Sequence, residues 1–425
     1  MSESAFLEKL LDGAEVEWVP LAEGENRITE LKRGRVMSKG YLVENSGDYP
    51  VYSSQTARNG QIGKIKTFDF DGESITWTTD GANAGTVFHR TGKFSITNVC
   101  GIIRICDVDR LNYRYLFHYL SFNTQKHVYA GMGNPKLMSN QMAKIPIPIP
   151  CPENPEKSLA IQAEIVRILD TFTELTAELT AELTARKKQY NYYRDQLLTF
   201  DLPARQAGGR QEDGEVCLSG RQVEWKTLGE VAEYSKNRIS SEDVDESNYV
   251  GVANLLQNKE GKTTSNYVPA QGNLTGYKGS DILIGNIRPY LKKIWQADCA
   301  GGVNGDVLVI HPTDEDIEPR YLYQILADDG FFEYNMQHAK GAKMPRGNKP
   351  KIMEYKIPVP FPNDPEKSLA EQARIVAILD KFDTLTHSIS EGLPREIELR
   401  QKQYEYYRDL LLNFPKSEPQ TEIVA

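Results

Sequence analysis

Residues 144–200 read KIPIPIPCPENPEKSLAIQAEIVRILDTFTELTAELTAELTARKKQYNYYRDQLLTF, and a close copy, KIPVPFPNDPEKSLAEQARIVAILDKFDTLTHSISEGLPREIELRQKQYEYYRDLLLNF, occupies residues 356–414. A duplicated segment fixes the architecture of a chain before local signals are considered. The beginning of each half recurs too: Gly13, Val16, Glu17, Trp18 and Leu21 return as Gly220, Val223, Glu224, Trp225 and Leu228. The sequences in between differ strongly. The chain is therefore predicted to have two halves that share a scaffold and carry different modules.

Each copy predicts an exit strand followed by a long helix. The KIPIPIP and KIPVPFP runs alternate apolar residues with proline, which has no amide donor and is confined to edge strands. Asn154 and Asp364 are helix caps, each followed by proline and an acid. Apolar residues then recur at helical spacing, and those expected to pack the helices and dock partners are Phe172, Leu175, Leu179, Leu183, Tyr190, Tyr193, Phe382, Leu385, Ile389, Tyr404 and Tyr407. Because each helix is too long for one small domain, we expect an antiparallel coiled coil between the modules.

The first helix contains a tandem Thr-Ala-Glu-Leu repeat at residues 176–183. Four residues lengthen a helix by ~6 Å and rotate its downstream part by ~40°. The repeat is either a solvated, helix-favouring stretch or a ruler that sets the distance between the modules. The second helix carries Gly392 and Pro394, so a kink or break is expected there.

Composition limits the class of protein. The chain has 425 residues, a net charge of −9, five scattered cysteines without a CxxC pair, and six histidines without zinc-ligand spacing. These features predict a soluble, cytoplasmic protein without a metal site. No run of about eighteen apolar residues occurs. The negative total does not exclude nucleic acid, since phosphate contacts need only a local basic face.

The first module is expected to be mixed α+β. Residues 4–12 predict a short amphipathic helix that packs beside the C-terminal helix. Runs at residues 49–54, 73–79, 85–90 and 100–105 predict strands, and residues 114–120 a helix. Three polar stretches between these elements are either ordinary loops or, taken together, a DNA-reading surface with groups for base edges and phosphates. Their candidate DNA contacts are Ser54, Gln55, Arg58, Asn59, Lys64, Lys66, Thr79, Asn83, Asn134 and Lys136.

The second module repeats the order of elements and ends in the most basic stretch of the chain. Residues 339–351, AKGAKMPRGNKPK, contain five cations and no acid, and their glycines and prolines predict a non-helical loop. The stretch is either a solvated charge run or a phosphate and groove contact. The candidate DNA contacts of this module are Asn286, Arg288, Lys292, Lys293, Lys340, Lys343, Arg346, Asn348, Lys349 and Lys351. Residues 201–216 are rich in glycine and charge and predict a linker.

Signatures of catalysis are missing from the sequence. There is no Asn- or Asp-Pro-Pro-aromatic tetrapeptide of a base methyltransferase. The Gly-Lys-Thr at residues 261–263 has Leu256 where a phosphate-binding loop needs glycine. The Glu-Asn-Pro-Glu-Lys and Asn-Asp-Pro-Glu-Lys strings suggest a nuclease, but both begin helices of the duplicated scaffold and are interpreted as caps. No catalytic residue is assigned.

The two modules, the PEKSLA and IVxILDxF motifs and the QYxYYRDxLLxF endings resemble the specificity subunit of type I restriction-modification systems, and the tandem repeat is similar to that of the IC subfamily. The resemblance spans the whole chain. It implies an α+β fold with two mixed α/β target recognition domains, two long antiparallel helices and a pseudo-twofold internal repeat. The implied boundaries are residues 1–152 and 217–363 for the recognition domains, 153–200 and 364–415 for the helices, 201–216 for a linker and 416–425 for a flexible tail.

The resemblance also implies a function. Each domain would read one half of a bipartite, asymmetric site on double-stranded DNA, and the helices would set the spacer and dock two modification subunits that methylate adenine. S-adenosylmethionine, ATP and Mg would be bound by those subunits and by restriction subunits, with no cofactor in this chain. The alternatives from the residues are a coiled-coil assembly protein whose heads bind proteins, and a self-contained nuclease. The loops carry lysine, arginine, asparagine and glycine instead of apolar patches, which favours the DNA reader.

Overall fold

The structure, a computed structural model, describes residues 4–24, 27–129, 133–198, 223–388 and 391–415. Contacts divide the chain into two compact units: a first unit made of residues 1–178 and 398–425, and a second unit made of residues 179–397. Each unit contains a head, residues 16–150 in the first and 223–360 in the second, together with segments of the long helices. The predicted linker and tail lie outside the described residues.

The first unit begins with helix α1 (Ser4–Leu11) and continues into the first head. Its strands are β1 (Val16–Pro20), β2 (Thr29–Arg33), β3 (Ser46–Tyr52), β4 (Gln61–Ile65), β5 (Ser74–Thr78), β6 (Val87–Arg90), β7 (Ser95–Ile96), β8 (Cys100–Ile105) and β9 (Pro146–Pro150). Its helices are α2 (Lys39–Glu44), α3 (Tyr113–Asn123), α4 (Ser139–Met142) and the 3-10 turns η1 (Ala57–Gly60) and η2 (Thr124–His127). The sheets have the orders β2-β8-β5-β6, β4-β3-β7 and β1-β9. The four predicted strands and the predicted helix are confirmed, with small differences at their ends.

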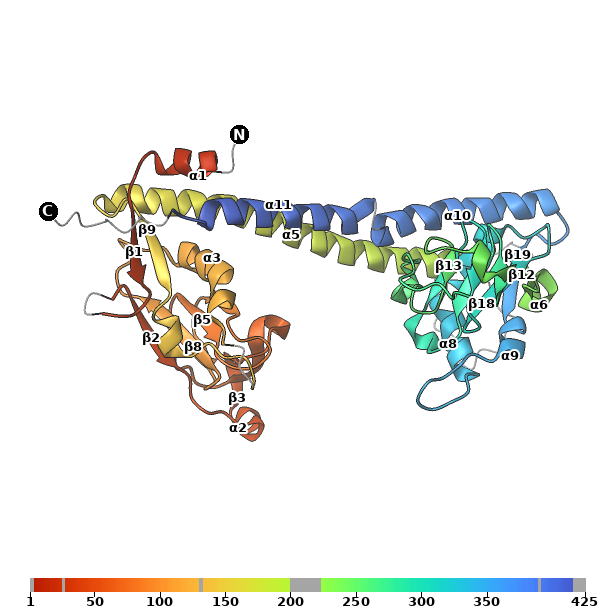
Figure 1. Ribbon diagram of the computed structural model, residues 1–425. Coiled ribbons are helices and arrows are strands. Elements are labelled where there is room, and N and C mark those ends of the chain that lie inside the picture. Colours follow the sequence, from red (N-terminus) through yellow and green to blue (C-terminus); the bar gives the residue numbers. More distant parts are fainter. Residues whose placement is uncertain (1–3, 25–26, 130–132, 199–222, 389–390, 416–425) are drawn as a thin grey trace. The chain divides into compact units, whose positions relative to one another are not determined.

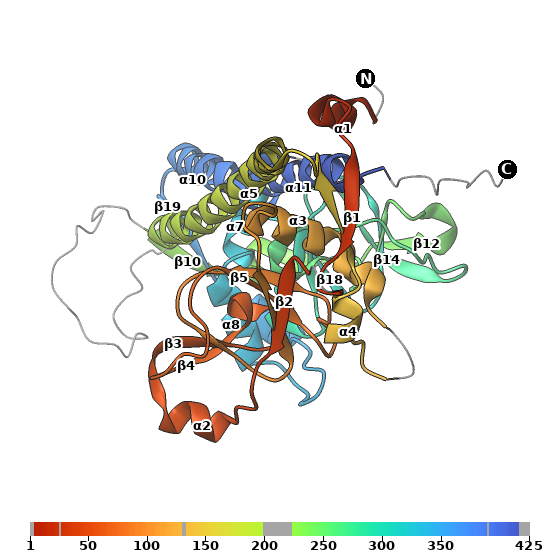
Figure 2. The same ribbon diagram turned by 90° about the vertical axis from the view of Figure 1, so that its left-hand side faces the viewer.

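The core of the first head lies between its four-stranded sheet and α3. Ile75, Trp77 and Ile103 from the sheet and Tyr115 and Leu116 from α3 are all fully buried in one apolar cluster. The same cluster takes in side chains from α1 and from the end of the C-terminal helix, so the predicted packing of these two helices is confirmed. Figures 1 and 2 show β3, β4 and α2 at the end of this head opposite to the long helices of the unit.

The second head repeats this plan with different loops. Its strands are β10 (Val223–Thr227), β11 (Ala232–Tyr234), β12 (Arg238–Ser240), β13 (Tyr249–Val250), β14 (Asn273–Tyr277), β15 (Ile282–Gly285), β16 (Ile294–Gln296), β17 (Gly301–Val303), β18 (Val307–Pro312) and β19 (Lys356–Pro360). Its helices are α6 (Leu228–Val231), α7 (Pro319–Leu326), α8 (Asp329–Gln337), α9 (Lys349–Met353) and the 3-10 turns η3 (Ser241–Asp243), η4 (Gln257–Lys259) and η5 (Pro289–Leu291). The sheets have the orders β11-β18-β15-β16, β12-β14-β17-β13 and β10-β19.

The proline-rich strands β9 and β19 are the predicted edge strands. Each pairs with one partner, antiparallel, with Pro148 opposite Trp18 and Pro358 opposite Trp225. Two tyrosines fix them from the core side: the Tyr115 hydroxyl donates to the Pro148 carbonyl at 2.8 Å, and the Tyr321 hydroxyl donates to the Pro358 carbonyl at 2.9 Å. The two halves thus repeat at the level of single hydrogen bonds.

The long helices follow the predicted pattern, including the interruption expected in the second of them. Helix α5 (Pro155–Leu198) is continuous and supplies residues to both units. The predicted second long helix of residues 364–415 is instead two helices, α10 (Pro365–His387) and α11 (Gly392–Leu412). The expected break is confirmed, and Gly392 explains it: its φ of +76° suits glycine, and a Cβ there would lie 2.5 Å from the Thr384 carbonyl oxygen. In each unit the paired helices run in opposite directions (Figure 1).

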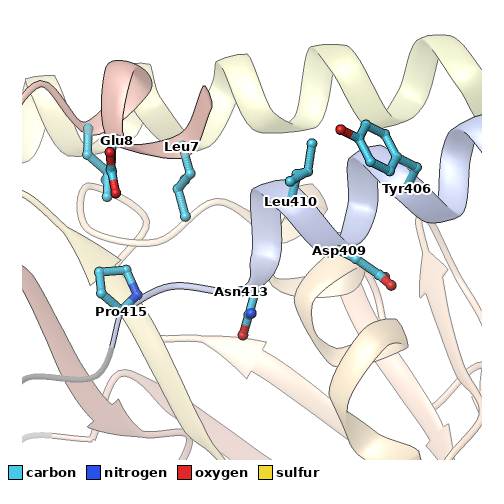
Figure 3. A pocket seen from close by; sticks show the side chains of 8 residues that line it. Leu7, Glu8, Tyr406, Asp409, Leu410, Asn413 and Pro415 are labelled. Atoms are coloured by element: carbon cyan, nitrogen blue, oxygen red, sulfur yellow. The ribbon is translucent and has the colours of Figure 1, made fainter. Parts of the chain in front are cut away.

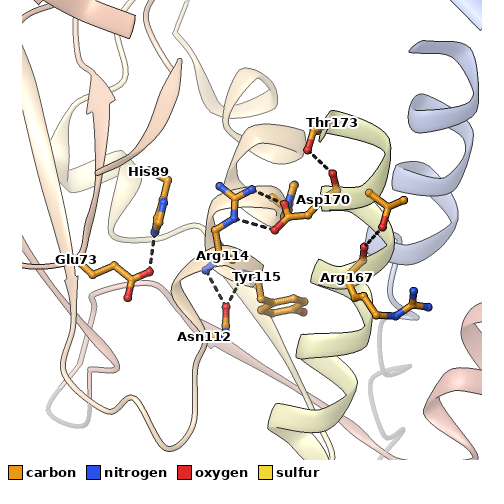
Figure 4. A network of polar contacts seen from close by, with 10 residues as sticks. Glu73, His89, Asn112, Arg114, Tyr115, Arg167, Asp170 and Thr173 are labelled. Atoms are coloured by element: carbon orange, nitrogen blue, oxygen red, sulfur yellow. Dashed lines mark hydrogen bonds and ion pairs between the residues drawn. The ribbon is translucent and has the colours of Figure 1, made fainter. Parts of the chain in front are cut away.

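An ion pair ties one helix of each head, α3 in the first and α7 in the second, to the scaffold. Arg114 on α3 donates its Nε to Asp170 on α5 at 3.2 Å (Figure 4). His118 Nε2 lies 2.7 Å from the same carboxylate. In the second unit Arg320 Nε donates to Asp380 at 2.9 Å and Gln324, in place of the histidine, donates at 2.6 Å. Burial opposes ionisation of Asp170, but the hydrogen bonds from His118 and Arg114 outweigh it and lower its pKa to about 2.

Candidate nucleic-acid interface

The three polar stretches of the first head lie together. The Asn83 side-chain amide donates to the Ser54 carbonyl at 3.2 Å, which joins the first stretch to the second. The Gly81 amide donates to the Pro135 carbonyl at 3.0 Å, which joins the second to the third. These contacts make one surface from loops that are distant in sequence, as an interface requires.

Residues 53–61, which include the turn η1, form the first of these loops. Arg58 and Asn59 both adopt left-handed backbone conformations, with φ of 52° and 53°, and both are exposed. The loop closes through the Ser53 amide, which donates to the Gly60 carbonyl at 2.9 Å. From the neighbouring strand β6, Arg90 donates to the Asn59 carbonyl at 2.6 Å. The sequence gives no signal for Arg90, because a single arginine at a strand end has no distinctive pattern.

The other candidates of the first head divide by exposure. Lys64, Lys66, Asn134 and Lys136 are exposed or half-buried at the surface. Ser54 and Gln55 are half-buried, and the Gln55 amide donates to the Gln61 carbonyl at 2.5 Å within the loop. Thr79 is fully buried, and its hydroxyl accepts a hydrogen bond from Arg33 at 3.0 Å. Its side chain is therefore not available for contact with DNA.

In the second head the basic stretch forms a hairpin, which we call the second hairpin (residues 340–347). The backbones of Lys340 and Arg346 exchange two hydrogen bonds of 2.9 and 2.8 Å. Arg288 donates its amide to the Pro345 carbonyl at 2.7 Å, so the predicted cluster around Arg288 lies beside the hairpin. Arg288, Lys340, Lys343, Arg346 and Lys349 all reach the surface. Arg346 also pairs with Asp306 at 3.3 Å and remains exposed, so the hairpin presents several surface cations, one of them beside a carboxylate.

Three candidates of the second head are used by the fold itself. Lys292 forms an ion pair with Asp329 at 2.8 Å. Lys293 donates its ammonium to the Val252 carbonyl at 2.7 Å, and burial lowers its pKa. Asn286 is 6% exposed, too little to reach a base edge. These residues are therefore better explained as supports of the loops than as contacts to DNA.

The last part of the basic stretch differs from the structure predicted for it. Residues 349–353 form helix α9, although the stretch is predicted to be free of helix. Pro350 lies in the first turn of α9, where the missing N–H costs no intrahelical hydrogen bond. Asn348 precedes this helix and is half-buried, and Lys351 pairs with Glu354 at 2.6 Å.

The first head carries an equivalent hairpin. The backbones of Tyr129 and Lys136 exchange hydrogen bonds of 2.8 and 3.0 Å, and we call residues 129 and 133–136 the first hairpin. In both hairpins a proline precedes the cation: Pro135 precedes Lys136, and Pro345 precedes Arg346. The carbonyl of this proline accepts a hydrogen bond from a backbone amide of the loop that follows β5 in the first head and β15 in the second. The same backbone device thus presents a cation in each head.

The predicted helix-face residues are used largely inside each unit. Phe172 stacks on Tyr407, with ring centroids 5.1 Å apart, in the first unit. Tyr190 and Tyr193 stack on Phe382 at 5.9 and 5.5 Å in the second unit. The remaining described members of the set are half-buried: Leu179, Leu183, Leu385 and Tyr404. Leu175 is exposed, and Ile389 lies outside the described residues. Tyr192 and Tyr406, which the periodic pattern does not mark, are exposed aromatic residues of this region, at 58% and 50%.

Metal-binding clusters and membrane-spanning helices are absent from the described part of the chain. Over those ranges, no group of three or more histidine, cysteine, aspartate or glutamate side chains could hold a metal ion. Among the helices of the same ranges, none has the length and apolar character needed to cross a membrane.

Comparison with known proteins gives one consistent family. The type I restriction modification DNA specificity domain matches residues 26–186 and again residues 221–399. The specificity subunit of the type I restriction enzyme EcoR124I/EcoR124II of Escherichia coli is 38% identical, over 98% of this chain and 99% of its own length. A putative type I specificity subunit of Haemophilus influenzae is 32% identical, over 96% and 98%.

Solved structures agree on the fold. The S subunit of a type I restriction-modification system from M. genitalium aligns over 96% of this chain and 98% of its own, with a TM-score of 0.58 at 16% identity. A chain of another type I system, studied for complex assembly and conformational transition, aligns over 93% and 97% with a TM-score of 0.53 at 14% identity. This chain therefore belongs to the family of type I restriction-modification specificity subunits, which recognise DNA and leave catalysis to partner subunits.

Proposed function

We propose that each head of this chain reads one half of a bipartite, asymmetric DNA site. The observation that carries the proposal is the repeated hairpin: the same hydrogen bonds present Lys136 in the first head and Arg346 in the second, while the surrounding side chains differ. Arginine and lysine are the side chains most used for guanine edges and phosphates. A repeated frame with different side chains suits two half-sites of different sequence.

The proposed contacts are the candidates of the two heads that reach the surface. They are Arg58, Asn59, Lys64, Lys66, Asn134 and Lys136 in the first head, and Arg288, Lys340, Lys343, Arg346 and Lys349 in the second. Ser54, Gln55, Asn83 and Asn348 are assigned to support of the loops. The net charge of −9 does not oppose this assignment, since the proposed cations lie at the surface of the heads.

We also propose that the helices dock two modification subunits, one for each repeat. Tyr192 and Tyr406 hold equivalent places in the Gln-Tyr-x-Tyr-Tyr-Arg-Asp motif. Each packs edge-on against the next tyrosine, with ring centroids 5.6 and 5.4 Å apart, and remains exposed. Tyrosine is enriched among the residues that contribute most to the binding energy of protein interfaces. Two equivalent positions suit two copies of one partner.

In the first unit a cavity adjoins this surface. It has a volume of about 490 Å³ and lies between α1 and the end of α11 (Figure 3). Leu7, Leu11 and Leu410 supply apolar walls, Tyr406 lies at its side, and Glu8 and Asp409 add negative charge. An apolar side chain followed by a basic group on the modification subunit would fit these walls.

The remaining parts of the proposal concern the complex. S-adenosylmethionine would be bound by the modification subunits that methylate adenine, and ATP and Mg by restriction subunits. The tandem at residues 176–183 would set the unread spacer, as in the IC subfamily. Its support is geometric, since four helical residues advance the chain by ~6 Å, about two base-pair rises.

The test is adenine methylation across a genome, read by single-molecule sequencing, in cells that express this chain with its modification subunit. Cells with the modification subunit alone are the control. A split motif that depends on this chain is expected and would give both half-sites. A soluble, assembled complex without new methylation would contradict DNA reading and favour heads that bind proteins.

A further inference from the structure

The loop of residues 53–61 holds an unfavourable backbone shape. Arg58 and Asn59 follow each other in the left-handed region, which asparagine tolerates but arginine rarely adopts. Such a conformation persists only where surrounding contacts enforce it, and it concentrates at functional sites. Since both side chains are exposed, the strain is not explained by burial of either one.

Besides the hydrogen bonds that close the loop on itself, one contact that holds this turn comes from a buried cation. Arg90 is 7% exposed, and its Nη2 donates to the Asn59 carbonyl at 2.6 Å. Its Nε donates to the Thr76 hydroxyl at 3.2 Å. The guanidinium lies 3.6 Å from the centroid of the Tyr52 ring and 4.4 Å from that of Phe88. The two hydrogen-bond acceptors of Arg90, the Asn59 carbonyl and the Thr76 hydroxyl, are both neutral.

Burying a charge is costly unless hydrogen bonds or a counter-charge compensate it, and Arg90 is compensated by its two hydrogen bonds and by the rings of Tyr52 and Phe88. Burial lowers the pKa of Arg90, but an arginine remains charged at neutral pH. The charge strengthens the hydrogen bond to the Asn59 carbonyl, because charge-assisted bonds exceed neutral ones. Gly60 completes the fit: its φ is +82°, and a Cβ there would lie 3.2 Å from Arg90 Nη2.

We propose that Arg90 is a positioning residue for specificity: it holds the strained Arg58–Asn59 turn in the shape that presents these two side chains to DNA. The inference rests on the proposed DNA-reading function and adds a residue that does not itself touch DNA. Preorganisation of the loop removes the entropy loss that a mobile loop would suffer on binding.

The second head supports the inference by repeating the strained turn. The strand before each turn, β3 or β13, pairs in parallel with β7 or β17. Each turn then contains two successive left-handed residues, Arg58 and Asn59 in one head and Asn258 and Lys259 in the other, the latter with φ of 55° and 68°. The Lys259 amide donates to the Lys292 carbonyl at 2.9 Å. The left-handed backbone is thus shared by the two turns, but Lys259 is tied to Asp329 at 3.0 Å, so the second turn does not expose the same pair of side chains.

The test uses the full chain in its assembled modification complex. Arg58→Ala first identifies which half of the methylation motif depends on the turn. Arg90→Lys keeps the charge but loses the paired donors, and Thr76→Val removes only the acceptor of Arg90 Nε. Arg104→Lys is the matched control, since Arg104 lies on β8 of the same sheet and donates to the Asp71 carbonyl instead.

Arg90→Lys should reduce base discrimination in the Arg58-dependent half about tenfold, in keeping with loss of a charged hydrogen bond. The other half and the thermal unfolding temperature should change little, and Thr76→Val should act in the same direction more weakly. A folded Arg90→Lys complex with an unchanged motif, or with both halves relaxed equally, would overturn the inference. If Arg90→Lys fails to fold, Thr76→Val decides in the same way. A wild-type complex without any motif would overturn the proposed function itself.

Discussion

Lys136 and Arg346 occupy the same position in two hairpins that share their hydrogen bonds but not their sequences. Each comes after a proline whose carbonyl is held by an amide of the loop after a central strand, Gly81 in the first head and Arg288 in the second. Duplicated frames with exchanged side chains provide a way to vary a DNA target without altering the fold.

Single replacement of either hairpin cation should affect one half-site only. Lys136→Ala and Arg346→Ala should each weaken binding of the complex by about 1–3 kcal/mol, the usual value of a base-edge contact. Binding to DNA with one or the other half-site altered is the measurement. If either variant weakens recognition of both halves alike, the division of labour between the heads is wrong.

The surface lysines of the second head should act through phosphates. The triple variant of Lys340, Lys343 and Lys349 to alanine should lower the slope of log affinity against log salt by as much as about 3, because each phosphate contact contributes roughly 0.9. Fluorescence anisotropy of the complex at several salt concentrations gives the slope.

Lys292→Ala and Lys293→Ala are the matched controls. Both remove a lysine from the same head, but their ammonium groups already bind Asp329 and the Val252 carbonyl. They should leave the slope unchanged and destabilise the head by about 1 kcal/mol. A lower slope in these controls would show that the salt effect does not depend on exposure.

The different fates of these lysines show what sequence can and cannot predict. The duplicated scaffold is visible as a repeat between two distant segments, and the proline edge strands and the break before α11 follow from local proline chemistry and from Gly392. Whether a cation is exposed is decided by tertiary packing, so Lys292, Lys293, Thr79 and Asn286 could not be separated from Lys343 by composition. Arg90 was missed for the same reason: its importance arises from the loop it contacts, thirty-one positions away.

Asp170 should make the first unit sensitive to acid. Its folded pKa of about 2 lies below the ordinary 3.8, so the ionised form stabilises the fold above pH 4 and that stabilisation is lost as the pH falls toward 2. Asp170→Asn should remove about 2 kcal/mol at neutral pH. Its stability should then vary less between pH 4 and pH 2. Thermal unfolding across this range is the measurement, with Asp48→Asn, an exposed carboxylate on β3, as control.

Deleting residues 176–179 should change the spacer and keep both half-sites. The deletion shortens α5 by one repeat, ~6 Å, and rotates the downstream part of the helix by ~40°. Inserting a third copy should act in the opposite direction. The methylation motif of each complex measures the unread length directly. An unaltered spacer in both variants would favour a solvated stretch that only supports the helix.

Tyr192 and Tyr406 should each secure one modification subunit. Because they are equivalent and exposed at 58% and 50%, replacing one by alanine should weaken one docking site and leave the other. An exposed aromatic anchor at an interface contributes about 2 kcal/mol or more. Native mass spectrometry near the dissociation constant should then show complexes with one modification subunit in either single variant and few complexes in the double variant. Tyr267→Ala, at 70% exposure in the second head, is the control and should retain two. Loss of both subunits in a single variant would mean that the two sites are not independent.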